Sequence, residues 1–366
     1  MRVLVVNAGS SSLKLRVLGP GDELVASRDL PATDGQVDQG ELRKVIEEVD
    51  HLQAVGHRIV HGGTEFSEPV RIDQAVERRL RALSDLAPLH QPKSLAALDA
   101  VTALLADVPA VACFDTAFHA GMPAAAATYA LPRAWRERWE LRRFGFHGLS
   151  HAYAAGRAAE LVGRPAEQLR IVTCHLGAGA SLTAVRGGRS VDTTMGFTPL
   201  EGIVMATRSG SVDPGLVLWL LQHEDQSADQ VAEALEHRSG LEGLAGNADM
   251  RAIIEAVAAG DADATLAVDV YVHRLCGAVA AMAAAAGGID LLAFTGGVGE
   301  NAPEVRRLAC ERLAWLGVGI DAASNAGGSG DRDLSAAGAT VRTVVVAARE
   351  DLQIAREVRR VLGAPS

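Results

Sequence analysis

Polar and charged side chains suited to phosphate chemistry occur in short glycine-rich segments of this chain. The first segment, residues 7–14, reads N-A-G-S-S-S-L-K and stands between two apolar runs, which predicts a turn joining two strands. Such a turn points backbone N–H groups and hydroxyls at one spot, and Lys14 adds a positive charge beside it. The pattern indicates a phosphate-binding turn. An ordinary hairpin is the alternative, because Gly and Ser are common turn residues.

Arg58 lies inside an apolar run, residues 54–60, that is typical of a buried strand and leads into H-R-I-V-H-G-G. A buried guanidinium is costly unless it meets an anion, so Arg58 indicates either a structural ion pair or an anion-binding site. Asp115 follows directly after a second apolar run, residues 108–114. A carboxylate at that point of an α/β fold is often catalytic or metal-binding, and an Asx turn or helix cap is the alternative.

Two further glycine-containing segments carry side chains that could take part in chemistry, histidines in the first and an arginine in the second. Residues 143–151 read R-F-G-F-H-G-L-S-H, and the spacing of His147 and His151 would suit two metal ligands on one helical face. A glycine follows His147, however, so we expect this residue to precede the helix and predict no zinc site. Residues 207–215 read T-R-S-G-S-V-D-P-G, which predicts a tight loop that presents the guanidinium of Arg208.

The elements around these segments predict an α/β fold with an internal duplication. Residues 5–14, V-V-N-A-G-S-S-S-L-K, and residues 173–183, T-C-H-L-G-A-G-A-S-L-T, both read as strand, Gly and Ser turn, strand. This similarity indicates two related domains that each offer a phosphate-facing hairpin. Residues 294–301, F-T-G-G-V-G-E-N, read as strand, glycine turn and helix start, a usual place for a nucleotide but also a common turn.

Composition excludes several classes of protein. The 366 residues are 48% hydrophobic and 22% charged, which suits a globular protein large enough for two cores. The formal net charge of −10 argues against nucleic acid or an anionic membrane as partner. Four widely spaced cysteines suggest neither a zinc site nor a disulfide framework. The most apolar stretch, residues 275–294, is interrupted by Gly287, Gly288 and Asp290, so we read a buried helix, a turn and a strand. No signal pattern opens the sequence, and we expect a cytoplasmic protein.

Taken together, these segments resemble the acetate kinase family, within the superfamily of acetate and sugar kinases, heat-shock chaperone ATPases and actin. Eight segments match in order: N-A-G-S-S-S-L-K, H-R-I-V-H-G-G, F-D-T-A-F-H, R-F-G-F-H-G-L-S-H, H-L-G-A-G-A-S, D-T-T-M-G-F-T-P-L-E-G, T-R-S-G-S-V-D-P-G and F-T-G-G-V-G-E-N. The resemblance implies an α/β fold of two duplicated actin-like ATPase (ribonuclease H-like) domains with a nucleotide cleft between them. Residues 1–119 plus 352–366 would form the N-terminal domain, and residues 120–351 the C-terminal nucleotide-binding and dimerisation domain.

The activity implied by the resemblance is the reversible, direct in-line transfer of a phosphoryl group from ATP to acetate, giving acetyl phosphate and ADP. Mg²⁺, or Mn²⁺ in its place, would be the cofactor, and the protein would be a homodimer that uses neither nucleic acid nor a membrane. Propionate or another short-chain acid is the alternative acceptor. A non-catalytic ATP-binding switch is a different class of function, but it would not need Arg58 and Arg208 at a carboxylate-sized site.

The resemblance also implies site residues by position. The catalytic positions are Asp115, His147, Arg208 and Arg58. The substrate-binding positions are Arg58, Val60, Leu89, His90, Phe146 and Pro199. The ATP-binding positions are Lys14, Ser10, Ser12, His175, Leu176, Gly177, Ala178, Gly179, Asp249, Met250, Arg251, Gly297, Val298, Gly299, Glu300 and Asn301. The metal positions are Asn7 and Glu350, an all-oxygen set of the kind that Mg²⁺ prefers.

Specific roles follow from the chemistry of phosphoryl transfer, which depends on positioning and charge neutralisation. The resemblance implies that Arg58 pairs with the acetate carboxylate and that Arg208 and His147 stabilise the transferring phosphoryl group. Asp115 matches an acid/base position. Because acetate is already an anion, we expect Asp115 instead to orient Arg58 or a metal-bound water.

The sequence departs from the family pattern at three places, and the chain is somewhat short for the family. Ala178 stands where the family usually has Asn, which removes one side-chain hydrogen bond near the phosphates. The segment A-R-E-D-L keeps Glu350 but adds the positive charge of Arg349 beside it. Q-P-K-S follows Leu89 and His90 in place of the usual N-P-x-N. We expect these departures to affect nucleotide affinity and to leave the reaction class intact.

Overall fold

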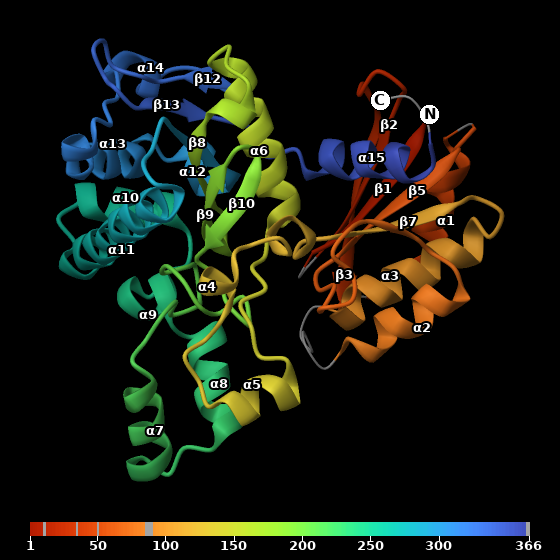
Figure 1. Ribbon diagram of the computed structural model, residues 1–366, viewed down its shortest axis with the longest axis horizontal. Helices are drawn as coiled ribbons and strands as arrows, with labels where there is room; N and C mark the ends of the chain where they lie inside the picture. Colours follow the sequence, from red (N-terminus) through yellow and green to blue (C-terminus); the bar gives the residue numbers. More distant parts are fainter. Residues whose placement is uncertain (10–11, 34–35, 50, 85–90, 364–366) are drawn as a thin grey trace. The chain divides into compact units, whose positions relative to one another are not determined.

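The computed structural model describes residues 1–9, 12–33, 36–49, 51–84 and 91–363, and its chain folds into two compact units (Figure 1). Unit 1 consists of Met1–Ala120, Phe146–Tyr153 and Arg349–Ser366, and unit 2 of Gly121–Gly145 and Ala154–Ala348. The domain boundaries expected from the sequence, residues 1–119 with 352–366 and residues 120–351, refer to the duplicated domains and stay a prediction.

Unit 1 is built on a seven-stranded sheet with the strand order β4-β3-β2-β1-β5-β7-β6. Its strands are β1 (Val3–Ala8), β2 (Ser12–Leu18), β3 (Leu24–Thr33), β4 (Gln36–Val37), β5 (Ala54–Ile59), β6 (Val70–Arg71) and β7 (Ala110–Phe114). β1, β2 and β3 form an antiparallel meander, whereas β5 is parallel to β1 and β7 is parallel to β5. The predicted strands on either side of the first phosphate turn are therefore confirmed.

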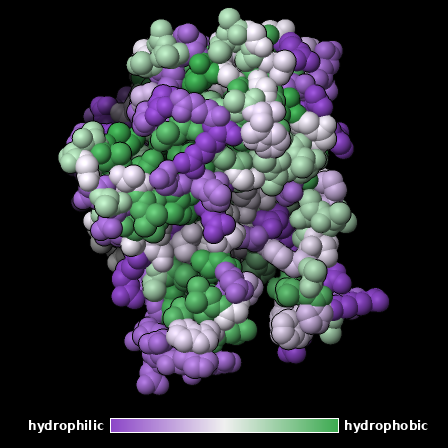
Figure 2. Space-filling model, turned by 90° about the vertical axis from the view of Figure 1, so that its left-hand side faces the viewer, coloured by the Kyte–Doolittle hydropathy of each residue, from purple (hydrophilic) through white to green (hydrophobic). Residues whose placement is uncertain are grey.

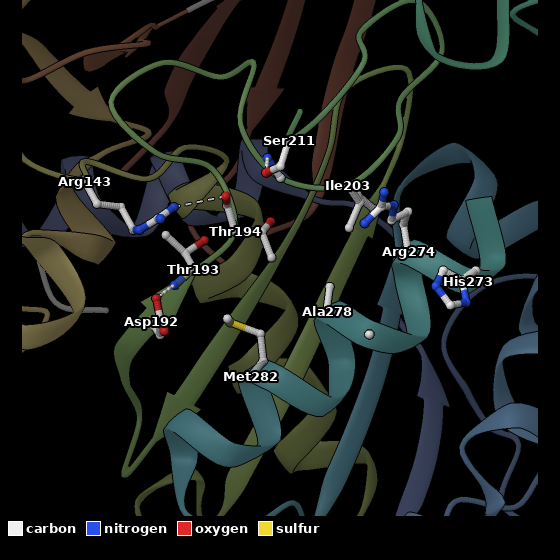
Figure 3. Close-up of a pocket in the computed structure, with 12 residues that line it drawn as sticks. Arg143, Asp192, Thr193, Thr194, Ile203, Ser211, His273, Arg274, Ala278 and Met282 are labelled. Atoms are coloured by element: carbon white, nitrogen blue, oxygen red, sulfur yellow. Dashed lines mark hydrogen bonds between the residues drawn. The ribbon is translucent and has the colours of Figure 1, made fainter. Parts of the chain in front are cut away.

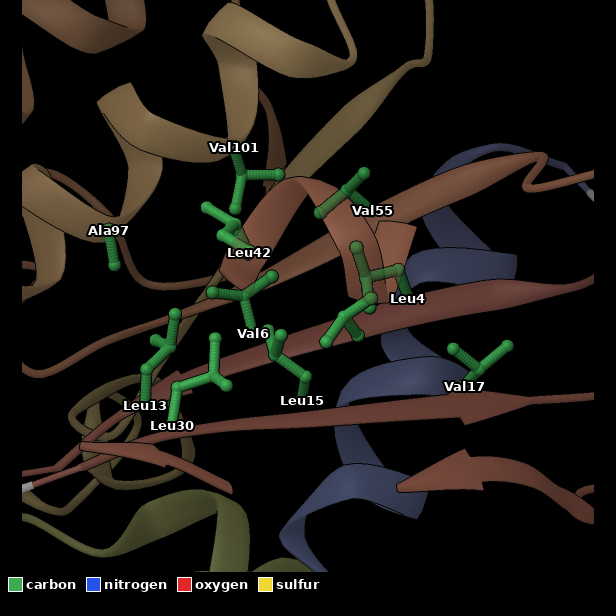
Figure 4. Packing of buried hydrophobic residues seen from close by; sticks show 11 residues of the cluster. Leu4, Val6, Leu13, Leu15, Val17, Leu30, Leu42, Val55, Ala97 and Val101 are labelled. Carbon is green, nitrogen blue, oxygen red and sulfur yellow. The ribbon is translucent and has the colours of Figure 1, made fainter. Parts of the chain in front are cut away.

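Helices cover both faces of this sheet. Apolar side chains of β1, β2 and β5 pack against α1 (Gln39–Glu47) and α3 (Gln91–Leu104), as Figure 4 shows. α15 (Glu350–Val361) packs against β1, β5 and β7. It lies on the opposite face, because Val55 belongs to the α1 and α3 cluster whereas a Cβ on Gly56 would lie 2.5 Å from Ile354 of α15. α2 (Gln74–Ala82) packs against α3, and the short helix η2 (Ala117–His119) follows β7.

Unit 2 is built on a six-stranded sheet with the strand order β10-β9-β8-β11-β13-β12. Its strands are β8 (Arg170–Leu176), β9 (Ala180–Arg186), β10 (Arg189–Thr193), β11 (Leu291–Thr295), β12 (Arg332–Asp333) and β13 (Arg342–Val345). β8, β9 and β10 form an antiparallel meander, and β11 and β13 continue the sheet in parallel with β8.

The two sheets share one topology. In each, a three-strand meander is followed by two parallel strands, and a short last strand, β6 or β12, pairs antiparallel with the outer one. β1, the turn and β2 in unit 1 correspond to β8, the turn and β9 in unit 2. The duplication predicted from the two similar Gly and Ser turns is confirmed, and it extends over every strand of the two sheets except β4, the two-residue edge strand of unit 1.

Unit 2 also contains most of the helices. They are α4 (Ala124–Ala127), α5 (Arg133–Trp139), η3 (Ala166–Gln168), α7 (Pro214–His223), α8 (Ala228–His237), α9 (Gly240–Ala245), α10 (Met250–Ala258), α11 (Ala262–Ala286), α12 (Gly296–Asn301), α13 (Pro303–Arg312), η4 (Ala314–Leu316) and α14 (Ala322–Ala326). α6 (Gly148–Leu161) begins in unit 1 and continues in unit 2. Side chains cap the first turn of five of these helices: Asp213 in α7, Ser227 in α8, Asp249 in α10, Asp261 in α11 and Asp321 in α14.

α11 is a long, apolar helix of 25 residues. Among the helices of the described chain it alone is long and apolar enough to cross a membrane on those two criteria. It packs against β8, β9 and β10 and against α9, α10 and α13, which are the contacts of a core helix. Buried residues such as Tyr271 and Leu275 face those contacts. The expected buried helix, turn and strand in this part of the chain are confirmed by α11 and β11.

Candidate active site

Arg58 and Asp115 form the centre of the polar site in unit 1. β5 carries Arg58, and Asp115 follows directly after the neighbouring strand β7. The guanidinium donates from Nε to Asp115 Oδ1 at 3.0 Å and from Nη2 to Asp115 Oδ2 at 2.6 Å. Its Nη1 donates to Asn7 Oδ1 at 3.1 Å. The sequence allowed two interpretations of Arg58, a structural ion pair or an anion-binding site. The structural ion pair is present.

Burial and charge act against each other in this pair. Asp115 is 1% exposed. Burial disfavours the charged guanidinium, but the carboxylates of Asp115 and Glu350 outweigh it and raise the pKa of Arg58. Burial also raises the pKa of Asp115, and the adjacent Arg58 opposes that shift. Because both oxygens of Asp115 accept from one guanidinium, the pair is best described as two charges held by each other.

Asn7 links this pair to Glu350. Its Nδ2 donates to Glu350 Oε2 at 2.9 Å, while its Oδ1 accepts from Arg58. Glu350 is the first residue of α15, whose N-terminal end reaches the carboxyl end of β1. Asn7 and Glu350, the two expected metal positions, are thus direct neighbours.

The donor set at this point suits a hard cation. Mg²⁺ takes oxygen ligands and often uses only one or two protein carboxylates, with phosphate oxygens and water completing its shell. The Glu350 carboxylate meets that description, and the Asn7 amide oxygen, which accepts from Arg58, has a second lone pair that could ligate a metal. No cluster of three or more His, Cys, Asp or Glu that could hold a metal by itself occurs among the described residues. The residues present therefore fit a magnesium ion that arrives with a nucleotide.

Lys14 lies on the same side of the sheet as Asn7. The two residues are directly opposed partners in the β1–β2 ladder, so their side chains leave the same face. The turn between them closes with a hydrogen bond from Gly9 N to Ser12 O at 2.8 Å. Ser12 begins β2, whereas the expected phosphate contact Ser10 lies outside the described residues.

The segment after Gly145 brings His147 and Phe146 to this site. Gly148 N donates to Asp115 O at 2.8 Å, and a Cβ on Gly148 would lie only 2.2 Å from that oxygen, so only glycine fits. His147, at a φ of 56°, directly precedes Gly148, where α6 begins. The expectation that His147 stands before the helix is confirmed. His119 Nε2 donates to Phe146 O at 3.1 Å, which fixes the segment further.

Apolar residues expected to contact the substrate methyl group are only partly assembled in unit 1. Val60 and Phe146 are buried there, 6% and 1% exposed, and the ring of His61 lies 5.5 Å from the ring of Phe146. Leu89 and His90 lie outside the described residues. Pro199 belongs to unit 2, in the loop that follows β10.

In unit 2 the two glycine-rich segments expected to bind ATP are neighbours. His175 and Thr295 are paired at the ends of β8 and β11, so the segment 175–179 and α12 start side by side. Gly296 has a φ of 80°, and a Cβ there would lie 2.9 Å from the backbone of Leu176. Glycine is therefore required for α12 to begin so close to the first segment.

The loop that carries Arg208 is joined to the same region. Ala206 N donates to Ala178 O at 3.1 Å. Arg208 Nε lies 3.1 Å from Glu236 Oε2, and both side chains are mostly buried, at 19% and 16% exposure. Thr207 Oγ1 also donates to Glu236 O at 2.8 Å. Glu236 is a residue that the sequence did not single out, because α8 contains a second glutamate, Glu233, and no motif marks either one.

The remaining expected nucleotide segment has a clear local structure. Asp249 caps α10, since its side chain accepts from Arg251 N at 3.0 Å. The same carboxylate pairs with the Arg251 guanidinium at 2.9 Å, and both side chains are exposed. Met250, between them, is buried. The geometry assigns these residues a helix start and an exposed ion pair in unit 2.

Ala178 in unit 2 and Arg349 in unit 1, two departures from the family pattern, each have defined local contacts. Ala178 is exposed, and its carbonyl oxygen is occupied by Ala206 N. The Arg349 guanidinium donates from Nε and Nη2 to Asp351, each at 2.9 Å. The positive charge that Arg349 adds beside Glu350 is therefore largely neutralised by Asp351.

A separate cavity of about 340 Å³ opens in unit 2 between α11, the end of β10 and the loop that follows β10 (Figure 3). Its lining residues are Arg143, Asp192, Thr193, Thr194, Gly202, Ile203, Ser211, His273, Arg274, Gly277, Ala278 and Met282. Arg143 Nη2 donates to Glu201 Oε1 at 2.6 Å, and its Nη1 donates to the carbonyl oxygen of Thr194 at 3.1 Å. None of the expected site residues lines this cavity.

The duplicated sheets, each a meander followed by two parallel strands, define this protein as an α/β protein built from two duplicated actin-like domains. The sequence matches the family model described as the acetokinase family over residues 29–356. The chain belongs to the acetokinase family. It is therefore a kinase that transfers phosphate to a carboxylate group.

Individual relatives agree with this assignment. An acetate kinase of Gloeobacter violaceus is 44% identical, with 98% of each chain covered, and an acetate kinase of a Synechococcus strain is 43% identical, with 99% of each covered. Among solved structures, acetate kinase of Porphyromonas gingivalis is 35% identical with a TM-score of 0.92, covering 99% of each chain. A propionate kinase of Francisella tularensis is 33% identical with a TM-score of 0.91, covering 98% of this chain and 99% of that one.

Proposed function

We propose that this protein is an acetate kinase that transfers the γ-phosphoryl group of ATP reversibly to acetate, in the presence of Mg²⁺ or Mn²⁺, giving acetyl phosphate and ADP. The observation that carries this proposal is the environment of Arg58. A guanidinium has five N–H donors, and the bonds to Asp115 and Asn7 use three of them. The outer edge of the guanidinium can therefore pair with the two oxygens of a small carboxylate.

Asp115 acts in this proposal by holding Arg58. Acetate has no proton to lose at neutral pH, so the reaction needs no general base at this point. Both oxygens of Asp115 already accept hydrogen bonds from Arg58, and the side chain is almost fully buried. These contacts support a positioning role for Asp115 in place of proton transfer.

The metal and nucleotide roles rest on residue type and neighbourhood. We assign Glu350 and Asn7 to Mg²⁺, which would neutralise charge on the phosphates when bound. Lys14, Ser10, Ser12 and the segments 175–179, 249–251 and 297–301 are assigned to ATP. Arg208 and His147 would stabilise the charge that develops on the transferring phosphoryl group.

Propionate is the second candidate acceptor, because one of the similar solved structures is a propionate kinase. One methylene changes discrimination by only about 1–3 kcal/mol in an apolar pocket. Initial rates with ATP and acetate, propionate or butyrate, with the acyl phosphate trapped as its hydroxamate, decide between them. The highest kcat/KM with acetate supports the proposal. ATP binding without acyl phosphate from any short acid would indicate an ATP-binding switch instead.

We further propose that the protein lies in the cytoplasm, since its proposed substrates ATP and acetate are small cytoplasmic molecules. We also propose that it forms a homodimer. Unit 2 exposes large apolar side chains along α7, where Leu216, Leu218 and Trp219 are 49%, 57% and 47% exposed. Figure 2 shows hydrophobic patches on the face of the molecule that it presents. Such patches often mark protein–protein contacts. Light scattering of the native protein and of Leu218→Glu tests this: a native dimer that becomes monomeric in the variant supports α7 as part of the interface.

A further inference from the structure

Arg306 is the largest fully buried side chain of the described protein, and it lies behind the glycine-rich helix α12. It extends from α13 and is 1% exposed. Its Nη1 donates to Gly299 O at 2.7 Å and to Glu300 O at 2.9 Å. These carbonyls belong to the last turn of α12, where no further helical N–H is available to bond them. Arg306 thus caps the C-terminal end of α12 from inside the protein.

Asn325 holds the other edge of the same guanidinium. Its Oδ1 accepts from Arg306 Nε at 2.8 Å, and its backbone carbonyl accepts from Nη2 at 3.0 Å. Asn325 Nδ2 in turn donates to Pro303 O at 2.9 Å, at the start of α13. Arg306 therefore has one orientation, set by α14 on one side and α12 on the other.

The charge of Arg306 is unusual because no carboxylate pairs with it in the described part of the chain. Its partners are carbonyl and amide oxygens only. Burial, together with the positive charge of Arg332, lowers its pKa to about 10, so it remains protonated at neutral pH. A buried cation is costly unless something compensates it. The carbonyl end of the α12 dipole supplies part of that compensation.

The opposite end of α12 is equally fixed. Gly296, at its start, packs on the backbone of Leu176, and a Cβ on Gly299 would be 3.7 Å from Cys174 O. α12 is therefore held against the segment 175–179 at one end and by Arg306 at the other. A helix of six residues has little stability of its own, so these outside contacts must define its position.

We propose that Arg306, oriented by Asn325, is a positioning residue for the nucleotide. It holds α12 at the distance from segment 175–179 that ATP and ADP require, and its positive charge, which no carboxylate in the described residues neutralises, favours a polyphosphate nearby. This inference rests on the proposed assignment of residues 297–301 to ATP. It adds a residue that touches no substrate and acts through the backbone of α12.

The test compares Arg306→Met with Arg307→Met. Met fills a similar apolar volume but cannot cap α12. Arg307 is the next residue of the same helix, and its guanidinium pairs with Glu304 and Glu311 at the surface, so it provides a matched control. We expect Arg306→Met to raise the KM for ATP and the Kd for ADP by roughly tenfold or more, with the KM for acetate changed by less than about twofold. Arg307→Met should leave all three constants near their native values.

Asn325→Ala keeps the proposal testable if Arg306→Met does not fold. It leaves the arginine in place but removes the Oδ1 acceptor, so a smaller rise in the KM for ATP is expected, again without a change for acetate. A folded Arg306→Met protein with native ATP and ADP constants would overturn the proposal, as would equal increases in both KM values. Native protein that binds ADP but makes no acyl phosphate would instead refute the proposed function. The ADP titration of the variants would still test Arg306 in that case.

Discussion

Arg58 and Asp115 form a two-pronged ion pair in which the carboxylate is buried and the guanidinium makes one further bond, to Asn7. The contacts at 3.0 and 2.6 Å fix the plane of the guanidinium, and Asn7 fixes its rotation through a third bond. A side chain held at three donors loses little further freedom when a carboxylate binds, which favours binding. In the proposed role of Arg58, the pair would hold a short acid in one orientation.

We expect Arg58→Ala to raise the KM for acetate far more than the KM for ATP, because it removes the partner of the substrate carboxylate. The same change leaves Asp115 buried without its cation, which typically costs about 3–5 kcal/mol of stability. Arg58→Ala combined with Asp115→Ala removes both charges and separates the two effects. If the double variant regains thermal stability and keeps the high KM for acetate, the assignment stands. A native KM for acetate in either variant contradicts it.

The pH dependence of stability should reflect the buried histidines of unit 1. Burial lowers the pKa of His57 to about 4 from 6.5, and it lowers the pKa of His119 to about 4 despite the bond to Phe146. The unfolded chain then binds more protons than the native one between those values, so stability rises with pH in this window and is lost as pH falls from 6.5 towards 4. Urea unfolding at pH 7 and pH 5 should show the loss.

A single substitution can isolate the contribution of His57. His57→Leu removes one proton-binding site of the unfolded state, so it should flatten the pH dependence by up to about 1.4 kcal/mol per pH unit. His223→Leu on α7 replaces an exposed histidine and serves as the control. Equal slopes in native protein and His57→Leu would mean that His57 does not titrate as its burial implies.

Several parts of the fold and site could be predicted from local patterns. The strand–turn–strand segments in both halves of the duplication follow from apolar runs broken by Gly and Ser, and Asp115 follows a run that is typical of a buried strand. Sequence alone left Arg58 with two readings, because it cannot say which anion lies beside a buried guanidinium. The pairing depends on the parallel register of β5 and β7, which is a property of the folded sheet.

Other residues could not have been found in the sequence. Glu236 and Arg306 lie in the middle or near the end of charged helices, and their neighbours Glu233 and Arg307 have the same residue types. What distinguishes them is burial and a partner far along the chain or in another element, such as Arg208 for Glu236. Helical periodicity separates a buried face from an exposed one, but α13 is too rich in charge for this pattern to mark Arg306.

Ala178→Asn should lower the KM for ATP several-fold and leave the KM for acetate nearly unchanged. An Asn there can donate a hydrogen bond to a phosphate, which is worth at most about 1.5–3 kcal/mol, and water can replace part of it in the native protein. Ala178 is exposed, so the larger side chain has room. The Arg349 guanidinium pairs with Asp351, so it is not expected to replace the amide of the Asn that the family usually has at position 178. An unchanged KM for ATP would mean that residues 175–179 do not approach the phosphates.

The last prediction concerns Arg208 and its partner Glu236 in the transition state of phosphoryl transfer. Arg208→Ala should lower kcat by roughly 10²–10³-fold with small changes in KM, as expected when one donor to a developing charge is lost. Wild-type turnover in that variant would exclude the proposed role of Arg208. Glu236→Gln keeps the size of the side chain but weakens its hold on Arg208, so we expect a smaller loss, on the order of tenfold.

The double variant decides how Glu236 acts. If Glu236 works only by orienting Arg208, Glu236→Gln should lower kcat no further once Arg208 is alanine, giving a large coupling energy in the cycle. Thr207 Oγ1 bonds the backbone carbonyl of Glu236, so this contact to the loop remains in every variant. Glu233→Gln, on the exposed part of α8, is the matched control and should leave kcat unchanged in both backgrounds. Additive losses in the double variant would show that Glu236 supports the fold of the loop independently of Arg208.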